Sequence, residues 1–246
     1  MSILSFLKKK DTSPASVLPI KTDIHSHLIP AIDDGVQSIE ESLTVLKEME
    51  SLGYEKVITT PHTMPGTYDN SPENIYEGLA KMRREIDRVG INIKLEAATE
   101  YYLDESFVEL IDSGAPLMTF GDNYVLFETP FMNQPPQLKE VTFKLAMKGY
   151  KPVFAHPERY FYLMQSEYLL EELINRKILF QLNIVALTGC YSKPVQKFAE
   201  KLIDMKAIQL VGTDCHNMGH IQLLKAAVKT KYFKKLMDLD LLNNRL

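Results

Sequence analysis

The chain has 246 residues, of which 45% are hydrophobic and 24% charged, and its formal net charge is −4. This composition is ordinary for a globular protein with a sizeable core, and the net charge argues against a protein that binds nucleic-acid phosphates. Two cysteines and the lack of a membrane-length apolar run predict a cytoplasmic protein with no disulfide scaffold and no integral membrane segment.

Residues 1–17 are expected to form a flexible extension. Their stretch KKKDTSPAS is polar and contains a proline. The lysines follow a short apolar stretch rather than precede it, which is the reverse of a secretory signal. Weak anchoring to a surface is the alternative to a disordered tail. The remainder, 18–246, is expected to form a single domain.

Short β-branched segments alternate with helical segments along this domain. The expected strands cover 20–27, 55–62, 93–102, 123–130, 151–159, 178–186 and 207–216. The expected helices cover 38–53, 72–89, 104–112, 137–148, 166–176 and 193–205. The first helix has the clearest ends, because Ser38 and Glu41 predict a capping box and Gly53 a stop.

Strict alternation of strands and helices indicates parallel strands, in either a doubly wound sheet or a βα barrel. Polar residues at the C-terminal ends of six strands favour the barrel; these are His25, His27, His62, Glu100, Glu128, His156, Asp214 and His216. In a barrel these ends converge on one face, whereas an open sheet would spread them apart.

This set of residues predicts a metal site. His25 and His27 are two positions apart on a strand, so both side chains leave the same face, and Asp214 and His216 repeat the spacing on the last strand. Singly, each residue has an ordinary alternative, such as a loop histidine or an ion pair. Together they would over-supply one ion, so two or three divalent ions fit better. In the turn IDDG, one aspartate would reach the metals while the other caps the turn.

Six stretches carry a resemblance to a known family: DIHSHLIPAIDDG, TTPHTMPGTYDN, ATEYYL, VLFETPF, FAHPERY and GTDCHN. With these motifs the chain resembles the PHP (polymerase and histidinol phosphatase) superfamily. It is most similar to the bacterial manganese-dependent protein-tyrosine phosphatases of the CpsB/CapC/YwqE type. The likeness spans about 20–217. It implies a distorted (β/α)7 TIM-like barrel of the PHP type, with the metal site at the C-terminal ends of the strands.

The resemblance also implies three metal ions. The first would be held by His25, His27, Glu100 and Asp214. Glu100 would bridge to a second ion bound by Glu128 and His156, and the third would be held by Asp34, His62 and His216. Asp33 would then be structural. Manganese is the ion expected from the family, while histidine-rich sites also admit iron, cobalt or zinc.

Bound divalent ions lower the pKa of water, so hydroxide becomes available to attack phosphorus in line. Arg159 is the expected catalytic and substrate-binding residue, because its planar fork matches phosphate oxygens. An ion pair with Glu158 is the alternative. Tyr101, Tyr102 and Tyr160 are candidates for binding a phenyl ring, with core or rim packing as the alternative.

The function implied is hydrolysis of phosphotyrosine on the tail of a bacterial tyrosine kinase that controls capsular or exopolysaccharide synthesis. A small-molecule phosphatase of the histidinol-phosphate type is the alternative, and a non-catalytic metal-binding protein is the remote one. A cysteine-nucleophile phosphatase is excluded, because neither cysteine is followed by a phosphate-binding loop with arginine six positions later.

Overall fold

The computed structural model describes residues 18–246; the extension expected over 1–17 lies outside them. The strands are β1 (Thr22–Asp23), β2 (Lys56–Thr59), β3 (His62–Thr63), β4 (Lys94–Ala97), β5 (Glu100–Tyr102), β6 (Tyr124–Glu128), β7 (Lys151–Ala155), β8 (Leu179–Asn183) and β9 (Leu210–Gly212). The α-helices are α1 (Ile39–Ser51), α2 (Pro72–Val89), α3 (Glu105–Ser113), α4 (Leu138–Met147), α5 (Phe161–Gln165), α6 (Glu167–Asn175), α7 (Lys193–Asp204), α8 (Met218–Ala227) and α9 (Lys231–Met237). Three 3-10 helices are η1 (Pro157–Arg159), η2 (Ile184–Thr188) and η3 (Leu242–Arg245).

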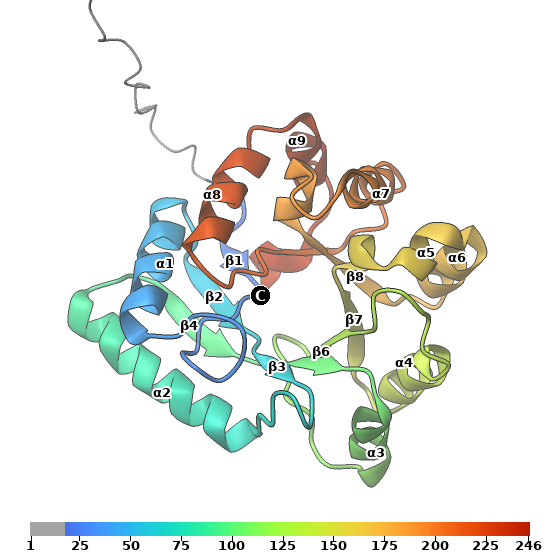
Figure 1. The fold of residues 1–246 in the computed structure, drawn as a ribbon, viewed down its shortest axis with the longest axis horizontal. Coiled ribbons are helices and arrows are strands. Elements are labelled where there is room, and N and C mark those ends of the chain that lie inside the picture. The colour runs from blue at the N-terminus through green and yellow to red at the C-terminus, as the bar shows by residue number, and fades with distance from the viewer. Residues whose placement is uncertain (1–17) are drawn as a thin grey trace, which may run out of the picture.

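The strands form two parallel ladders, β1-β2-β4 and β3-β5-β6-β7-β8-β9, with helices around the outside (Figure 1). Two expected strands, 55–62 and 93–102, are each interrupted. Pro61 lies at the first interruption and has no amide hydrogen to donate. The ladders still join there, because Ala98 N donates to Thr59 O (3.0 Å) and Glu100 N to Pro61 O (3.1 Å).

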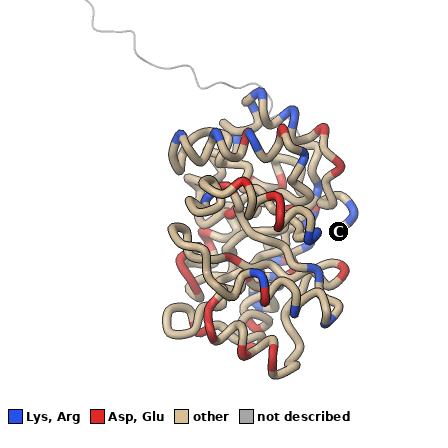
Figure 2. The backbone as a smooth tube through the Cα atoms, turned by 90° about the vertical axis from the view of Figure 1, so that its right-hand side faces the viewer, with Lys and Arg blue, Asp and Glu red and all other residues tan. Residues whose placement is uncertain are grey.

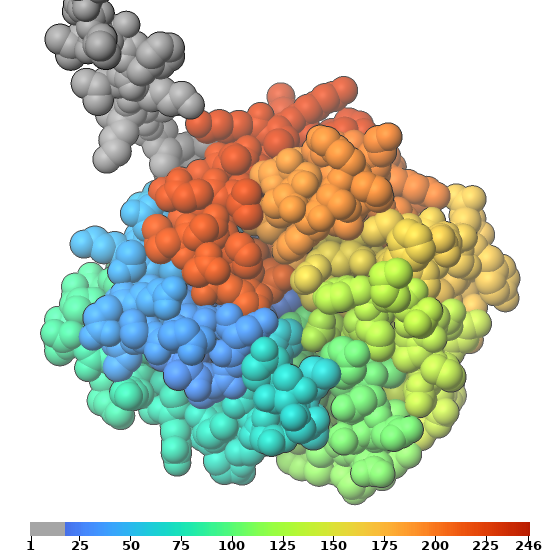
Figure 3. Space-filling view, in the orientation of Figure 1, coloured from blue at the N-terminus to red at the C-terminus, as the bar shows by residue number. Residues whose placement is uncertain are grey.

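The first and last strand segments lie side by side. A parallel bridge pairs Ser26 with Cys215, and Asp214 N donates to His25 O at 2.8 Å. The Asp23 carboxylate adds a link by accepting the Thr213 amide hydrogen at 2.8 Å. On the surface, the blue N-terminal and red C-terminal parts of the described chain also adjoin (Figure 3). The strand segments therefore follow one another around a ring, as the barrel prediction requires.

The core has two parts, which follow the alternation of side chains along the strands. A smaller cluster takes buried residues from several strands and fills the inside of the ring; it includes Ile24, Ile58, Leu126, Val153 and Leu210. A larger cluster contains the alternate strand residues, such as Val125 and Phe127, together with the buried faces of the helices. This is the layering of a (β/α) barrel.

Several local expectations need correction. Ser38 caps α1 by accepting Glu41 N, but the Glu41 carboxylate accepts from Gln37 N rather than from Ser38, so the capping box is only half formed. The sequence patterns gave no prediction of α5, α8 and α9. Of these, α8 packs against α1 and η2.

No helix in 18–246 is long and apolar enough to span a membrane. Both signs of charge occur at both ends of the tube in Figure 2, in keeping with the small net charge.

Candidate metal centre

The predicted ligands converge where the strands end. They surround a cavity of about 690 Å³. Its lining includes Asp34, His62, Glu100, Glu128, His156, Arg159, Asp214 and His216. His25 and His27 lie at the base and are completely buried. The structure therefore brings together all nine residues that the sequence put forward as ligands.

Glu100 and Asp214 lie against the first pair of histidines. His25 Nε2 is 3.2 Å from Glu100 Oε2 and 3.4 Å from Asp214 Oδ1. His27 Nε2 is 3.4 Å from the same Asp214 oxygen and 3.7 Å from Glu100 Oε2. Donor atoms of four residues therefore face one small volume.

Glu100 also reaches a second group. Its Oε1 lies 3.0 Å from His156 Nε2, which in turn is 3.7 Å from Glu128 Oε2. His62 Nδ1 lies 3.2 Å from one oxygen of Glu100 and 3.2 Å from one of Glu128. That nitrogen is buried and has no hydrogen bond of acceptable geometry to either within the described chain. His62 Nδ1 is therefore available to bind an ion between these carboxylates.

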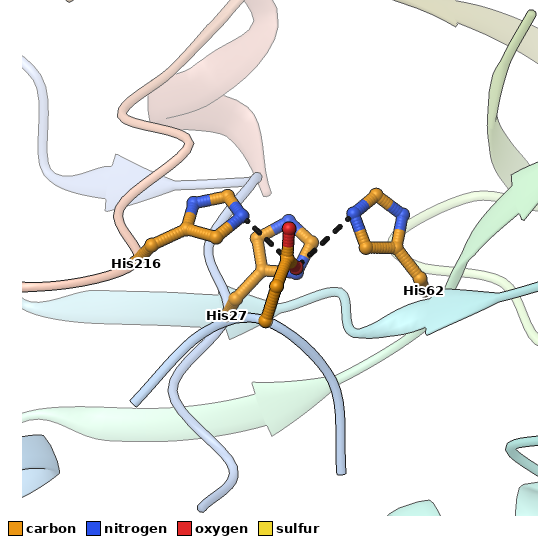
Figure 4. A group of neighbouring side chains, drawn as sticks. His27, His62 and His216 are labelled. Carbon is orange, nitrogen blue, oxygen red and sulfur yellow. Dashed lines mark ion pairs between the residues drawn. The ribbon is translucent and has the colours of Figure 1, made fainter. Parts of the chain in front are cut away.

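The third group surrounds Asp34. His62 Nε2 lies 3.5 Å and His216 Nε2 3.4 Å from Asp34 Oδ1, as the dashed lines in Figure 4 show. The His27 ring stacks on that of His216, with centroids 4.1 Å apart. One ligand atom from each of these four residues falls within 4.8 Å of the others. Asp34 belongs to this group, as the second aspartate of IDDG was expected to.

The histidines and carboxylates of the centre shift the pKa values of one another. Burial acts to lower the pKa of His25, but the Glu100 and Asp214 carboxylates outweigh it and raise the pKa to about 10. For His62, burial is likewise outweighed by Glu100 and Glu128, and the pKa rises to about 10. Against the effect of burial, His25 and His156 hold the pKa of Glu100 well below its usual range, and His25 and His27 do the same for Asp214. The buried carboxylates thus need positive charge, which imidazolium or metal can supply.

This donor set fits divalent metal ions. Imidazole nitrogens and carboxylate oxygens suit first-row transition metals, and the nearest guanidinium, Arg159, contacts only the edge of the cluster. Two of the predicted ligands also have left-handed backbone conformations, His156 with φ 33° and Asp214 with φ 50°. Strain of this kind at non-glycine residues is concentrated at functional sites.

Side chains behind the cluster orient its histidines. Asp33 Oδ2 accepts from His27 Nδ1 at 2.7 Å, so His27 presents Nε2 to the cavity. Gln181 Oε1 lies 2.7 Å from His25 Nδ1 and fixes that ring in the same way. Gln181 Nε2 donates to Asn183, whose own amide donates to Asp214 Oδ2 at 2.7 Å.

Sequence reasoning missed the two amides. Gln181 and Asn183 stand two positions apart at the C-terminal end of β8. That is the one expected strand with no charged residue at its end, and the same spacing rule could have found them.

Arg159 lines the cavity, and its Nη1 lies 3.3 Å from Asp214 Oδ2. The ion-pair partner of Arg159 is therefore Asp214, and not Glu158, which was the alternative. The Glu158 side chain is completely buried, and its Oε1 accepts the backbone N–H of Asn183 at 3.0 Å. Burial raises the pKa of the Glu158 carboxyl to about 8.

The three candidate tyrosines lie in different environments. Tyr102 lines the cavity. Tyr101 is buried instead, stacks on Phe107 with centroids 4.5 Å apart, and its hydroxyl accepts Met118 N. Tyr160 is fully buried, and its hydroxyl accepts Thr129 N. Substrate contact expected of Tyr101 and Tyr160 is therefore corrected to core packing, because each ring lies inside the protein.

Further lining residues were not anticipated. Met64, Phe131 and Met132 add apolar surface, and Tyr191 and His220 complete this set. Four of them lie in loops and His220 lies on α8, so strand spacing gave no signal for them.

Comparison with known proteins identifies the relatives of this arrangement. Residues 21–244 match the family described as capsular polysaccharide synthesis, CpsB/CapC. The chain belongs to the CpsB/CapC family. It is 30% identical over 198 residues to a putative tyrosine-protein phosphatase, CapC, of Staphylococcus aureus, covering 80% of this chain and 77% of the relative. Tyrosine-protein phosphatase YwqE of Bacillus subtilis is 29% identical over 197 residues, with the same coverage.

A solved structure supports the fold. It comes from work on YwqE of Bacillus subtilis and CpsB of Streptococcus pneumoniae, described as metal-dependent tyrosine phosphatases. It superposes with a TM-score of 0.79 at 26% identity and covers 91% of this chain and 94% of its own. The family and the barrel-like α/β fold expected from the sequence are confirmed.

Proposed function

We propose that this CpsB/CapC-family chain is a metal-dependent protein-tyrosine phosphatase. The observation that carries the proposal is the convergence of nine nitrogen and oxygen ligands, with one arginine, on a single cavity. Relatives over most of its length are named as tyrosine-protein phosphatases.

We assign three metal ions to this cavity. His25, His27, Glu100 and Asp214 would hold the first, Glu128 and His156 with Glu100 the second, and Asp34, His62 and His216 the third. The ligand separations of 3.0–3.7 Å support these groups. His27 also lies within reach of the third group. Manganese is the proposed ion, with iron, cobalt or zinc as substitutes in a site of this chemistry.

Divalent ions bound here would neutralise phosphate oxygens and activate water for attack on phosphorus. The protein contributes orientation. Asp33 and Gln181 hold His27 and His25 with Nε2 toward the cavity. Arg159 would donate to non-bridging phosphate oxygens, for which its planar fork is suited.

The cavity has an apolar side for the leaving group. Met64, Tyr102, Phe131 and Met132 line it, and Met132 is 62% exposed, so this surface can receive a ring that is still attached to a chain. A phenolate is a good leaving group, so the mechanism needs no protein acid to protonate it.

For the physiological substrate we propose the tyrosine-rich tail of a bacterial tyrosine kinase that controls capsular or exopolysaccharide synthesis, in the cytoplasm. The family description supports the link to capsule synthesis. A flexible tail suits a cavity with an exposed apolar margin.

The test is a comparison of substrates after metal removal and defined reconstitution. We expect kcat/KM for a phosphotyrosyl tail peptide to exceed that for phosphoserine peptide and histidinol phosphate by about a hundredfold, roughly 2.7 kcal/mol of transition-state binding. Equal or reversed preference would replace this proposal with a small-molecule phosphatase. Binding of metal without any phosphatase activity would leave a metal-binding protein.

A further inference from the structure

Two aromatic rings lie close to the guanidinium of Arg159. Its Cζ lies 4.4 Å from the ring centroid of Phe131 and 4.7 Å from that of Tyr191. Phe131 belongs to the loop between β6 and α4, and Tyr191 to the segment between η2 and α7. Segments far apart in the sequence therefore meet on one side chain.

Each ring is held by contacts of its own. The carbonyl oxygen of Phe131 accepts Phe161 N at 2.8 Å, and its ring stacks on Tyr160 with centroids 5.8 Å apart. The Tyr191 hydroxyl accepts from Asn183 Nδ2 at 3.3 Å, the same amide that donates to Asp214. Both rings thus have anchors that do not involve the arginine.

The ion pair with Asp214 does not by itself fix the arginine. It joins one nitrogen, Nη1, to one oxygen at 3.3 Å, and it is the only side-chain hydrogen bond of the guanidinium within 18–246. A single contact leaves the plane of the guanidinium free to tilt. Two rings within 4.4 and 4.7 Å of Cζ restrict that freedom, because a cation is attracted to the face of an aromatic ring.

We infer that Phe131 and Tyr191 are positioning residues that set the plane of Arg159, so that a phosphoryl group is bound only along the guanidinium edge. With Cζ over the faces of two rings, the N–H groups at the guanidinium edge are the part that a ligand would use, and edge-on approach gives two parallel N–H···O bonds. The inference rests on the proposed function insofar as Arg159 is taken to bind phosphate.

The competing explanation is that these rings contact the phenyl ring of the substrate directly. Phe131 lines the cavity and is 38% exposed, so one of its edges is accessible. Direct contact and positioning differ in one respect: positioning acts only through Arg159. A double-mutant cycle with Arg159 separates them.

The experiment uses the full-length, metal-reconstituted protein and inorganic phosphate as the probe. Calorimetric phosphate affinity, metal content, kcat and KM are measured for Tyr191→Leu, Tyr191→Phe and Phe131→Leu, each also combined with Arg159→Ala. Tyr168→Leu is the control, because Tyr168 on α6 is 75% exposed and does not line the cavity.

Tyr191→Leu and Phe131→Leu should each weaken phosphate binding at least about fivefold, within the range of cation–π energies, with normal metal content. Tyr191→Phe keeps the ring but loses the bond to Asn183, so it should weaken binding less than Tyr191→Leu, and the Tyr168→Leu control should stay within about twofold of the wild type. KM should rise more than kcat falls, and in the Arg159→Ala background the leucine variants should cause no further loss.

Wild-type phosphate affinity in both leucine variants, or losses that persist without Arg159, would overturn the inference. Unchanged phosphate affinity in Arg159→Ala would overturn it as well. If Phe131→Leu or Tyr191→Leu does not fold, the other carries the test. Phosphate binding that depends on both rings and Arg159, in a protein that does not hydrolyse phosphotyrosine, would support the positioning role while rejecting the proposed function.

Discussion

Asp214 links Arg159 to the metal centre. Its Oδ2 lies 3.3 Å from Arg159 Nη1, whereas its Oδ1 lies 3.4 Å from Nε2 of both His25 and His27. One oxygen of this carboxylate therefore contacts two histidines of the predicted metal centre. The other oxygen contacts the arginine that is predicted to bind phosphate. Under the proposed function, phosphate recognition and metal binding would share this residue.

Arg159 can be tested apart from the metals. Arg159→Ala and Arg159→Lys should each lower kcat/KM by about a hundredfold or more, because lysine cannot reproduce the planar fork. Metal content should remain normal, since Asp214 keeps its contacts with the histidines. Steady-state kinetics with metal analysis measures both effects. Wild-type kinetics in Arg159→Ala would show that the residue is not needed for phosphate binding.

Loss of any one of the most buried metal ligands should abolish metal binding. Alanine at His25, Glu100 or Asp214 should remove metal and activity together, because each contributes to the most buried part of the cluster. Chelation should inactivate the wild type, and Mn²⁺ should restore activity better than Mg²⁺, which imidazole ligands do not suit. Full activity in a preparation verified as metal-free would contradict the proposed chemistry.

Much of this centre could be predicted because its ligands follow a simple rule. Histidines and carboxylates at strand ends mark one face of a barrel, so eight of the nine were found from strand positions. Asp34, in the turn IDDG, was assigned through the family resemblance. Gln181 and Asn183 obey the same rule but are neutral, so they drew no attention. Tyr101 and Tyr160 were expected near substrate because they adjoin ligands in sequence, yet Tyr101 alternates with Glu100 on β5 and must leave the opposite face. Phe131 and Tyr191 meet only through the fold.

The pH dependence of metal binding follows from the charged histidines. His25 and His62 have pKa values of about 10 in the metal-free protein, because nearby carboxylates outweigh burial. A bound metal needs unprotonated imidazole, so binding at pH 7–8 must release protons, and apparent affinity should rise with pH. Calorimetry in buffers of different ionisation enthalpy counts those protons. Binding without proton release would contradict this account.

The same groups give the metal-free protein an opposite trend in stability. A pKa raised above the unfolded value favours the folded state below about pH 6.5, and that contribution is lost as pH rises toward about 10. The free energy of unfolding should therefore fall across this range without metal. With metal bound, the fall should be smaller. Chemical denaturation at several pH values measures both.

Cys215 should be dispensable for catalysis although it lies between two predicted ligands. Its side chain is completely buried among core residues, and burial raises the pKa of its thiol. Cys215→Ala should keep most activity and lose at most about 3 kcal/mol of unfolding free energy through a small cavity. A thousandfold loss of kcat with the fold and metal content intact would point to a chemical role instead.

Tyr101 and Tyr102 provide a matched pair, because consecutive residues of β5 face opposite sides of the sheet. Tyr101→Phe removes the hydroxyl that accepts Met118 N and leaves that buried amide unpaired. It should lower the free energy of unfolding by about 1–3 kcal/mol and leave kcat/KM within about threefold. Tyr102→Ala removes cavity surface, so it should raise KM for phosphotyrosyl peptide and change stability less. Denaturation curves and kinetics on both variants test the division. A greater loss of catalysis in Tyr101→Phe than in Tyr102→Ala would contradict this division. Tyr101 would then have to act on the substrate through the strand, and the assignment of the apolar side of the cavity would need revision.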